Sequence, residues 1–237
     1  MPDRGVAVVT GAAQGLGRAV ATALVADGWQ VAALDVDAAG LATLAGPGLH
    51  PVAVDLADAD ATRAAIAGVQ RDVGPVGYLI HNAAILVPEP FEAVTFARWS
   101  ATVNVQLQAA YLLTHAVWSG MKAAGHGRVV LVSSQSGIRG FADETAYCAA
   151  KHGLEGLMKA LALEAEGTGV AVSTITPGML MRTPMSERNY DAASKAKWVD
   201  PALLAPAFTH LGALADARHN GERLDAWKLA QEVARDA

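Results

Sequence analysis

The chain has 237 residues, of which 52% are hydrophobic and 17% are charged, and its formal net charge at pH 7 is −5. The length predicts one α/β domain over residues 1–237, and the mild negative charge without a basic block excludes nucleic acid and membrane surfaces as expected partners. The single cysteine, Cys148, excludes an internal disulfide framework and is typical of a cytoplasmic protein, and the scattered histidines predict no metal site.

Strands and helices alternate along the chain, which predicts a Rossmann-type, doubly wound parallel sheet of about seven strands with helices on both faces. Strands are predicted over residues 6–9, 30–34, 52–54, 76–81, 128–132 and 170–175, with a short edge strand at 223–226. Helices are predicted from the first glycine turn to residue 24 and over residues 58–73, 98–124, 145–166 and 201–217. Residues 179–200 lack clear periodicity and are predicted to form a substrate loop.

The first glycine turn follows a buried strand and opens a helix. Residues 6–21 read VAVVTGAAQGLGRAVA, with an apolar β-branched run before glycines 11, 15 and 17. Such a turn lets backbone N–H groups approach a pyrophosphate, and the helix N-terminus directs its partial positive charge at the same place. The flanking strand and helix favour a dinucleotide site over a merely structural turn.

Asp35 ends the second predicted strand 18 residues after Gly17, near the spacing of an acid that binds the adenosine ribose diol. A carboxylate there repels a 2′-phosphate, and Asp37 adds negative charge with no Lys or Arg close by in sequence. These residues favour NAD over NADP. The alternative is that Asp35 only caps the next helix.

Ser134, Tyr147 and Lys151 form a second constellation. Tyr147 and Lys151 are four residues apart on a predicted helix and therefore share a face, while Ser134 ends a strand. A nearby ammonium, helped by a positive nicotinamide ring, favours the phenolate and is expected to bring the tyrosine pKa, ordinarily ~10, toward neutrality. A Tyr–Lys pair alone is usually structural, but together with the glycine turn and Ser134 it favours acid–base catalysis.

Further motifs stand at intervals along the chain: TGAAQGLG at residues 10–17, Asn82-Ala83, Asn104, YCAAK at residues 147–151 and Pro177-Gly178. With Ser134, they resemble the short-chain dehydrogenase/reductase family in order and spacing over nearly the whole chain. The resemblance implies hydride transfer, with Tyr147 as acid/base, Ser134 holding the substrate oxygen and Lys151 on the nicotinamide ribose. It also implies that Asn104 bends its helix and holds a water in a proton relay.

The resemblance extends to the cofactor site. The implied cofactor contacts are Gly11, Gln14, Gly15, Leu16, Gly17, Asp35, Asp55, Leu56, Asn82, Ala83, Tyr147, Lys151, Pro177, Gly178 and Thr183. Gln14 stands where NADP-using members often carry a basic residue, which agrees with the preference for NAD.

Three departures from the family pattern stand out. His81 opens a segment that reads His-Asn-Ala-Ala in place of Asn-Asn-Ala-Gly, and it is expected either to pack in its strand or to neighbour the cofactor. Four residues rather than three separate Gly178 from Thr183, so the loop is expected to bulge. Residues 225–227 read Asp-Ala-Trp in place of Asp-Gly-Gly, and a charged tail follows, so the C-terminal packing is expected to differ.

We therefore predict an NAD(H)-dependent oxidoreductase that interconverts a secondary alcohol and a ketone and binds substrate through Ser134, Gln135 and Tyr147. The alternatives are a non-catalytic, dinucleotide-sensing module and an epimerase or dehydratase on the same scaffold. A 3-oxoacyl ester, a cyclic ketone, and a sugar or polyol fit equally well. The pocket is expected to include Ile85, Leu86, Gln135, Ser136, Ile138, Arg139 and Phe141. Helices around residues 101–118 and 146–163 are apolar on nearly every face, which predicts a homodimer or tetramer.

Overall fold

Seven parallel strands form one sheet in the computed structural model, which describes residues 4–44 and 46–236. The strands are β1 (Val6–Thr10), β2 (Gln30–Asp35), β3 (Leu49–Ala53), β4 (Val76–His81), β5 (Gly127–Val132), β6 (Val170–Thr176) and β7 (Arg223–Asp225). Their order is β3-β2-β1-β4-β5-β6-β7. The predicted fold class, a doubly wound parallel sheet, is confirmed.

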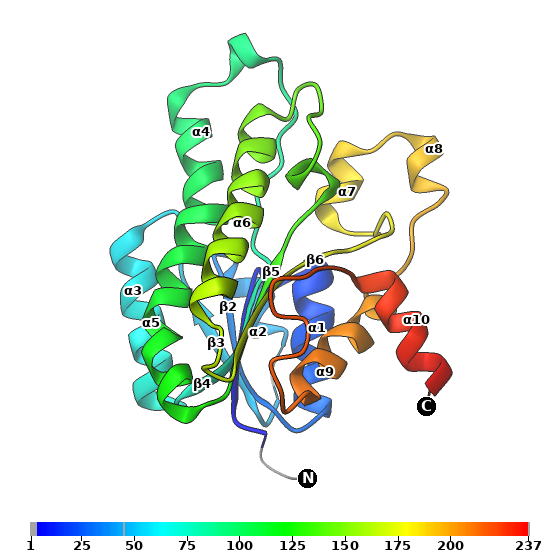
Figure 1. Cartoon of the computed structure of the whole chain (residues 1–237). Helices are drawn as coiled ribbons and strands as arrows, with labels where there is room; N and C mark the ends of the chain where they lie inside the picture. Colours follow the sequence, from blue (N-terminus) through cyan, green and yellow to red (C-terminus); the bar gives the residue numbers. More distant parts are fainter. Residues whose placement is uncertain (1–3, 45, 237) are drawn as a thin grey trace.

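Helices cover both faces of the sheet (Figure 1). One face carries α3 (Ala59–Asp72), α4 (Phe96–Val103), α5 (Ala109–Ala124) and α6 (Thr145–Glu164), and the other carries α1 (Gly15–Ala26), α9 (Ala205–Ala213) and α10 (Ala226–Asp236). The short helix α2 (Ala38–Ala42) follows β2. Strand side chains alternate between the two faces, so the β1 residues Val6 and Val8 join one core cluster and Ala7 and Val9 join the other.

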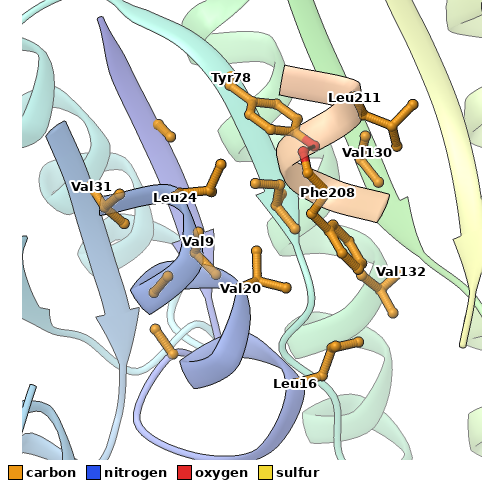
Figure 2. Close-up of a cluster of buried hydrophobic side chains, with 14 of the residues drawn as sticks. Val9, Leu16, Val20, Leu24, Val31, Tyr78, Val130, Val132, Phe208 and Leu211 are labelled. Atoms are coloured by element: carbon orange, nitrogen blue, oxygen red, sulfur yellow. Dashed lines mark hydrogen bonds between the residues drawn. The ribbon is translucent and has the colours of Figure 1, made fainter. Parts of the chain in front are cut away.

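Tyr78 of β4 is fully buried in the core on the α1 side (Figure 2). Its hydroxyl donates to the Phe208 carbonyl of α9 at 3.1 Å, while Val20 and Leu24 of α1 belong to the same cluster. Burial raises the pKa of Tyr78 above its ordinary value. The bond satisfies a buried donor and fixes α9 on the sheet.

The strand order reverses at β1, whose two neighbours are β2 and β4. In open parallel sheets, the connecting segments diverge at this point and leave a crevice beyond the carboxyl ends of the strands. Thr10, Asp35 and His81 are the last residues of β1, β2 and β4. The topology therefore brings the glycine turn and these three side chains to one edge.

The third strand differs from its prediction. It begins at Leu49 rather than at Val52 and ends at Ala53. Pro51 breaks the apolar pattern, but it is tolerated because β3 is an edge strand and leaves one side of its backbone unpaired.

The long helix predicted over residues 98–124 is irregular in the middle. It begins at Phe96, where the Thr95 hydroxyl accepts from the Arg98 N–H at 3.2 Å. A π turn over Asn104–Gln108 then separates α4 from α5. Such a turn is a recognised local cause of helix irregularity, and it lies where Asn104 was predicted to bend the helix.

The segment predicted as a loop over residues 179–200 contains two short helices, α7 (Pro184–Asn189) and α8 (Ala192–Lys195), drawn in yellow in Figure 1. The Thr183 hydroxyl accepts from the Ser186 N–H at 3.1 Å, and the Asp191 carboxylate accepts from the Ser194 N–H at 2.8 Å. These helices are marked by side-chain caps rather than by apolar periodicity, so the periodicity of the sequence did not predict them.

The structure of the C-terminal part of the chain also differs from the prediction. The helix expected over residues 201–217 is a 3₁₀ turn, Pro201–Leu204, followed by α9, which ends at Ala213. The charged tail after β7 forms α10, which packs against α9 with Ala226 and Ala230 buried. No helix within residues 4–44 and 46–236 combines the length and apolar character needed to cross a membrane.

Candidate active site

A cavity of about 290 Å³ lies at the crevice where the strand order reverses. Most of the predicted cofactor residues line it, namely Gly11, Gln14, Gly15, Leu16, Asp35, Asp55, Leu56, Asn82, Ala83, Tyr147, Lys151, Pro177 and Thr183. Segments far apart in sequence therefore share one cavity. It runs from the glycine turn to the Tyr–Lys pair.

The glycine turn forms a cradle that larger side chains would fill. Gly11 and Gly15 have φ values of 66° and 57°, a region that disfavours other residues. A Cβ at Gly11 would lie 2.8 Å from the Asn82 amide nitrogen, and a Cβ at Gly17 would lie 2.1 Å from the Gly11 carbonyl oxygen. Gly17 is buried outside the cavity and lets α1 pack against the turn. The cradle fits the pyrophosphate of a dinucleotide at the α1 N-terminus.

The Asp35 carboxylate is held at the cavity wall. One oxygen accepts from the Ala13 N–H at 2.9 Å and the other from the Asp37 N–H at 3.0 Å. The cap of α2 is Asp37, whose carboxylate accepts from the Gly40 N–H at 2.9 Å. Asp35 is therefore not the helix cap, and its position fits a ribose diol.

Arg18 was missed by the sequence analysis because it precedes Asp35 by a whole helix. Its guanidinium donates to the Ala13 carbonyl at 3.2 Å and to the Thr43 hydroxyl at 2.7 Å. A positive charge therefore lies beside the loop that binds Asp35. The N–H donors of the Arg18 guanidinium point at protein oxygens.

His81 lies fully buried between the glycine turn and the π turn. Its Nε2 is 3.0 Å from the Gln106 carbonyl, which only accepts, so Nε2 carries the proton and Nδ1 accepts from the Thr10 hydroxyl at 3.1 Å. The same hydroxyl oxygen accepts from the backbone N–H groups of Asn82 and Ala83, each at 2.9 Å. The packed-strand alternative for His81 is thus the observed one, with a defined tautomer.

We expect acid to destabilise the protein through His81. Burial, and secondarily the Lys151 ammonium, lowers the pKa of His81 to about 4, below its ordinary 6.5. At a pH between the two pKa values, the unfolded chain binds a proton at His81 and the native protein does not, so stability falls as the pH drops below about 6.5. The linkage predicts a loss of about 2 kcal/mol between pH 7 and pH 5.

Urea unfolding at both pH values measures this effect. In His81→Asn, which cannot titrate, the loss between pH 7 and pH 5 is expected to be smaller by that amount. His152→Asn, at an exposed position on α6, serves as the control and should behave like the wild type. An equal pH dependence in wild type and His81→Asn would contradict the burial of a neutral His81.

Tyr147 and Lys151 line the cavity, and Ser134 lies outside its wall, close enough to the Tyr147 phenol to influence its pKa. The Ser134 hydroxyl donates to the Ser136 hydroxyl oxygen at 3.3 Å, and the Lys151 Nζ lies 5.4 Å from the centre of the Tyr147 ring. Lys151 is buried, and its ammonium donates to the Val132 carbonyl at 2.7 Å. Burial lowers the pKa of Lys151 to about 7, and the charge of Glu155 opposes this shift.

The pKa of Tyr147 reflects the burial of its phenol. Burial raises it above its ordinary value, and the Ser134 hydroxyl only partly opposes this. The Lys151 ammonium is directed at the Val132 carbonyl rather than at the phenol oxygen. The protein's own groups therefore favour the protonated phenol, and the predicted shift toward neutrality, which includes the charge of the nicotinamide ring, stays a prediction.

The sequence model of the family described as short chain dehydrogenase matches residues 5–194. The chain belongs to the short-chain dehydrogenase family. L-xylulose reductase from Mus musculus is 40% identical to it over 194 residues, which cover 81% of this chain and 78% of the relative. D-threitol dehydrogenase from Mycolicibacterium smegmatis is 34% identical over 237 residues, covering 94% and 91%.

Solved structures agree with the family assignment. A protein from Beutenbergia cavernae, assigned as an NAD(P)-dependent gluconate 5-dehydrogenase and crystallised with bound NADP, has a TM-score of 0.83. It is 28% identical, and the match covers 94% of this chain and 96% of that one. This short-chain dehydrogenase is therefore an oxidoreductase acting on alcohol or ketone groups, in a family that uses NAD or NADP.

Some predicted site residues of this short-chain dehydrogenase lie apart from the cavity wall. The Asn104 amide donates to the Ala57 carbonyl at 3.4 Å, and Gln135 is exposed at the start of a 3₁₀ turn, Gln135–Gly137. Gly178 turns the chain at a φ of 77° against the Asp225 carboxylate. Ile138 and Phe141, expected in the substrate pocket, are exposed.

Other lining residues of this short-chain dehydrogenase were not predicted individually. They are Val36, Ala84, Val105, Val132, Ser133 and Pro184, whereas Met181 and Met185, which also line the cavity, had been expected either to line an apolar pocket or to anchor the loop. Apolar residues such as Val105 and Val132 carry no chemical signal, and only the fold places them. Thr183 faces the glycine turn, because a Cβ at Gly15 would lie 3.2 Å from its methyl group, although the loop before it is longer than in the family.

Proposed function

We propose that this protein is an NAD(H)-dependent oxidoreductase that interconverts a secondary alcohol and a ketone. The observation that carries the proposal is that Tyr147 and Lys151 line the same cavity as the glycine turn and Asp35, with Ser134 beside Tyr147. An arrangement of hydroxyl, phenol and ammonium beside a dinucleotide cradle suits proton transfer at an alcohol or ketone oxygen.

Residues along the cavity would hold the successive parts of the cofactor. The backbone of the glycine turn suits the pyrophosphate, Asp35 the adenosine ribose, and Asp55 with Leu56 the adenine. Lys151 suits the nicotinamide ribose, and Thr183 the carboxamide. When bound, the nicotinamide supplies or accepts the hydride.

The remaining chemistry falls to three side chains. Ser134 donates a hydrogen bond to the substrate oxygen and orients it beside the Tyr147 phenol. Because burial keeps that phenol protonated, Tyr147 is suited to donate its proton to the ketone oxygen in the reducing direction. Lys151 supplies a positive charge on the same helix face, fixed by the Val132 carbonyl.

A screen with both nucleotides tests the proposal. Oxidation of NADH and of NADPH is followed over sugars, cyclic ketones and 3-oxoacyl esters, beginning with sugars because two relatives are named for a ketose and a polyol. We expect ketone-dependent NADH oxidation. Nucleotide binding without oxidation across the panel would favour a dinucleotide-sensing module, and substrate conversion without net nucleotide oxidation would favour an epimerase or dehydratase.

We expect Asp35→Ser to shift the cofactor preference toward NADPH. Removing the carboxylate removes its repulsion of a 2′-phosphate and its bonds to a ribose diol, so the ratio of kcat/KM for NADPH to that for NADH should rise by about tenfold or more, or about 1.4 kcal/mol. The matched control is Asp72→Ser, which removes an exposed carboxylate at the end of α3, outside the cavity lining, and should leave the ratio unchanged. An unchanged ratio in Asp35→Ser would remove the basis for NAD preference.

We also infer that the chain forms a homodimer or tetramer through α4, α5 and α6. Phe96, Tyr111 and Leu163, one on each of these helices, are exposed large hydrophobic residues. Burying them against a second copy would remove apolar surface from water. The mass in solution, measured by light scattering, distinguishes this assembly from a monomer.

A further inference from the structure

A buried carboxylate lies one helical turn beyond Lys151. Glu155 of α6 accepts from the Ser133 hydroxyl at 2.5 Å and from the Thr174 hydroxyl of β6 at 2.9 Å. Its third partner is Arg223 of β7, whose Nε lies 3.1 Å from Oε1. Donors from three parts of the chain therefore meet on one carboxylate beside the candidate active site.

The same guanidinium reaches the backbone of the candidate catalytic serine. The Nη2 of Arg223 donates to the Ser134 carbonyl at 3.0 Å, while its Nε is paired with Glu155. The planar fork of arginine holds two acceptors at a fixed separation, which lysine does not do. Arg223 thus joins the edge strand, α6 and the segment after β5.

Ser134 lies at the point where the regular sheet hydrogen bonds end. The last of these bonds from β5 runs from the Ser133 N–H to the Ile175 carbonyl at 2.8 Å. Beyond it, the Ser134 carbonyl accepts from the Gly137 N–H at 3.0 Å, within its own turn, and from Arg223. Arg223 therefore ties this turn to the edge strand, while the Ser136 hydroxyl ties it to the Glu144 carboxylate at 2.8 Å.

A role in stability alone explains this arrangement poorly. Glu155 is buried but the Arg223 side chain is 25% exposed, and the desolvation of such a partly buried ion pair commonly offsets its Coulomb attraction. Such pairs are therefore weak stabilisers, and a better-attested use is to fix one arrangement of the chain. Here the arrangement that is fixed includes the backbone of Ser134. The Glu155 charge also opposes the lowering of the pKa of Lys151 by burial.

We propose that Arg223 is a positioning residue for the reaction and that, paired with Glu155, it holds the Ser134 turn in place from the edge strand β7. This inference rests on the proposed role of Ser134 in binding the substrate oxygen. It makes the C-terminal edge strand a functional part of the active site.

The test compares Arg223→Ala with Glu222→Gln, a neighbouring variant that loses only an exposed ion pair with His219. The readouts are kcat, KM for the ketone, NADH affinity by fluorescence titration, and melting temperature. In Arg223→Ala we expect kcat to fall by about 10- to 100-fold, the scale expected when a catalytic group is displaced by about 1 Å. The NADH Kd should stay within about twofold, because the dinucleotide cradle lies on other elements.

Chemical rescue separates positioning from folding. Millimolar guanidinium should restore part of the kcat of Arg223→Ala, whereas equal concentrations of urea or NaCl should not. If Arg223→Ala does not fold, Arg223→Lys keeps the charge beside Glu155 without the two-pronged fork, and it should fold with a lowered kcat and an unchanged NADH Kd.

Three results would overturn the proposal. They are an unchanged kcat in the Arg223 variants, a loss of kcat that only matches a loss of NADH-binding sites, and a loss that guanidinium does not relieve. Failure of the underlying function is distinct, because the wild type and Glu222→Gln would then turn over no ketone with either nucleotide.

Discussion

Replacing Tyr147 with Phe is expected to lower kcat by about 10³-fold and to leave NADH binding within about twofold. The substitution removes the hydroxyl that we propose exchanges a proton with the substrate oxygen, and acid–base catalysis by such a group contributes roughly 10²- to 10⁴-fold. The ring and its packing against Lys151 remain, so the cavity keeps its shape. Steady-state turnover of the best ketone and fluorescence titration of NADH measure the two effects.

Cys148→Ala provides the control for that variant. Cys148 is the next residue on α6, but its Sγ lies 3.8 Å from the Arg139 carbonyl and it is not among the cavity-lining residues. Its kcat should match the wild type. Substantial turnover in Tyr147→Phe would show that another group carries the proton.

The second large effect is expected from Ser134→Ala. Removing a hydrogen-bond donor aimed at an oxygen that develops charge typically lowers kcat by about 10²- to 10³-fold. It also removes the influence of the Ser134 hydroxyl, which lowers the pKa of Tyr147. The acidic limb of the pH profile for alcohol oxidation should therefore move to higher pH.

Ser173→Ala is the matched control, because Ser173 is buried in β6 opposite Val130 and outside the cavity lining. We expect that variant to keep the wild-type kcat and pH profile. If Ser134→Ala also kept them, Ser134 would be a turn residue with no contact to the reacting oxygen.

Local sequence was sufficient for the parts of the fold where neighbouring residues decide the structure. The apolar run of β1, the glycine turn and α1 were predictable because strand, turn and helix signals follow one another within 26 residues. The fourth strand matched its predicted bounds, residues 76–81, for the same reason. Parallel pairing of such strands follows from the alternation with helices.

Features that depend on contacts between distant parts of the chain could not be predicted from local sequence patterns. Pro51 was tolerated only because its strand lies at the edge, and α10 formed where α9 offered a surface for Ala226 and Ala230. Capping of the next helix was the alternative role for Asp35, and only the fold showed that Asp37 caps α2.

The candidate site shows the same division. Its chemistry was readable from residue types and spacing, but the pKa of Tyr147 depends on burial, which spacing does not report. The Arg223–Glu155 pair joins residues 68 positions apart, so no local sequence motif predicts it. The position of Arg18 beside the loop that binds Asp35 was likewise not predictable from local sequence.

The central claim is that the Tyr147 phenol, the Ser134 hydroxyl and the Lys151 ammonium surround the reacting end of a dinucleotide bound in the cavity. A crystal structure with NAD and a substrate-like alcohol tests it most directly. We predict that the alcohol oxygen lies within hydrogen-bonding distance, about 3 Å, of both the phenol and the Ser134 hydroxyl, with the nicotinamide beside them. A nicotinamide bound away from Tyr147, or a phenol turned away from the alcohol, would contradict the account.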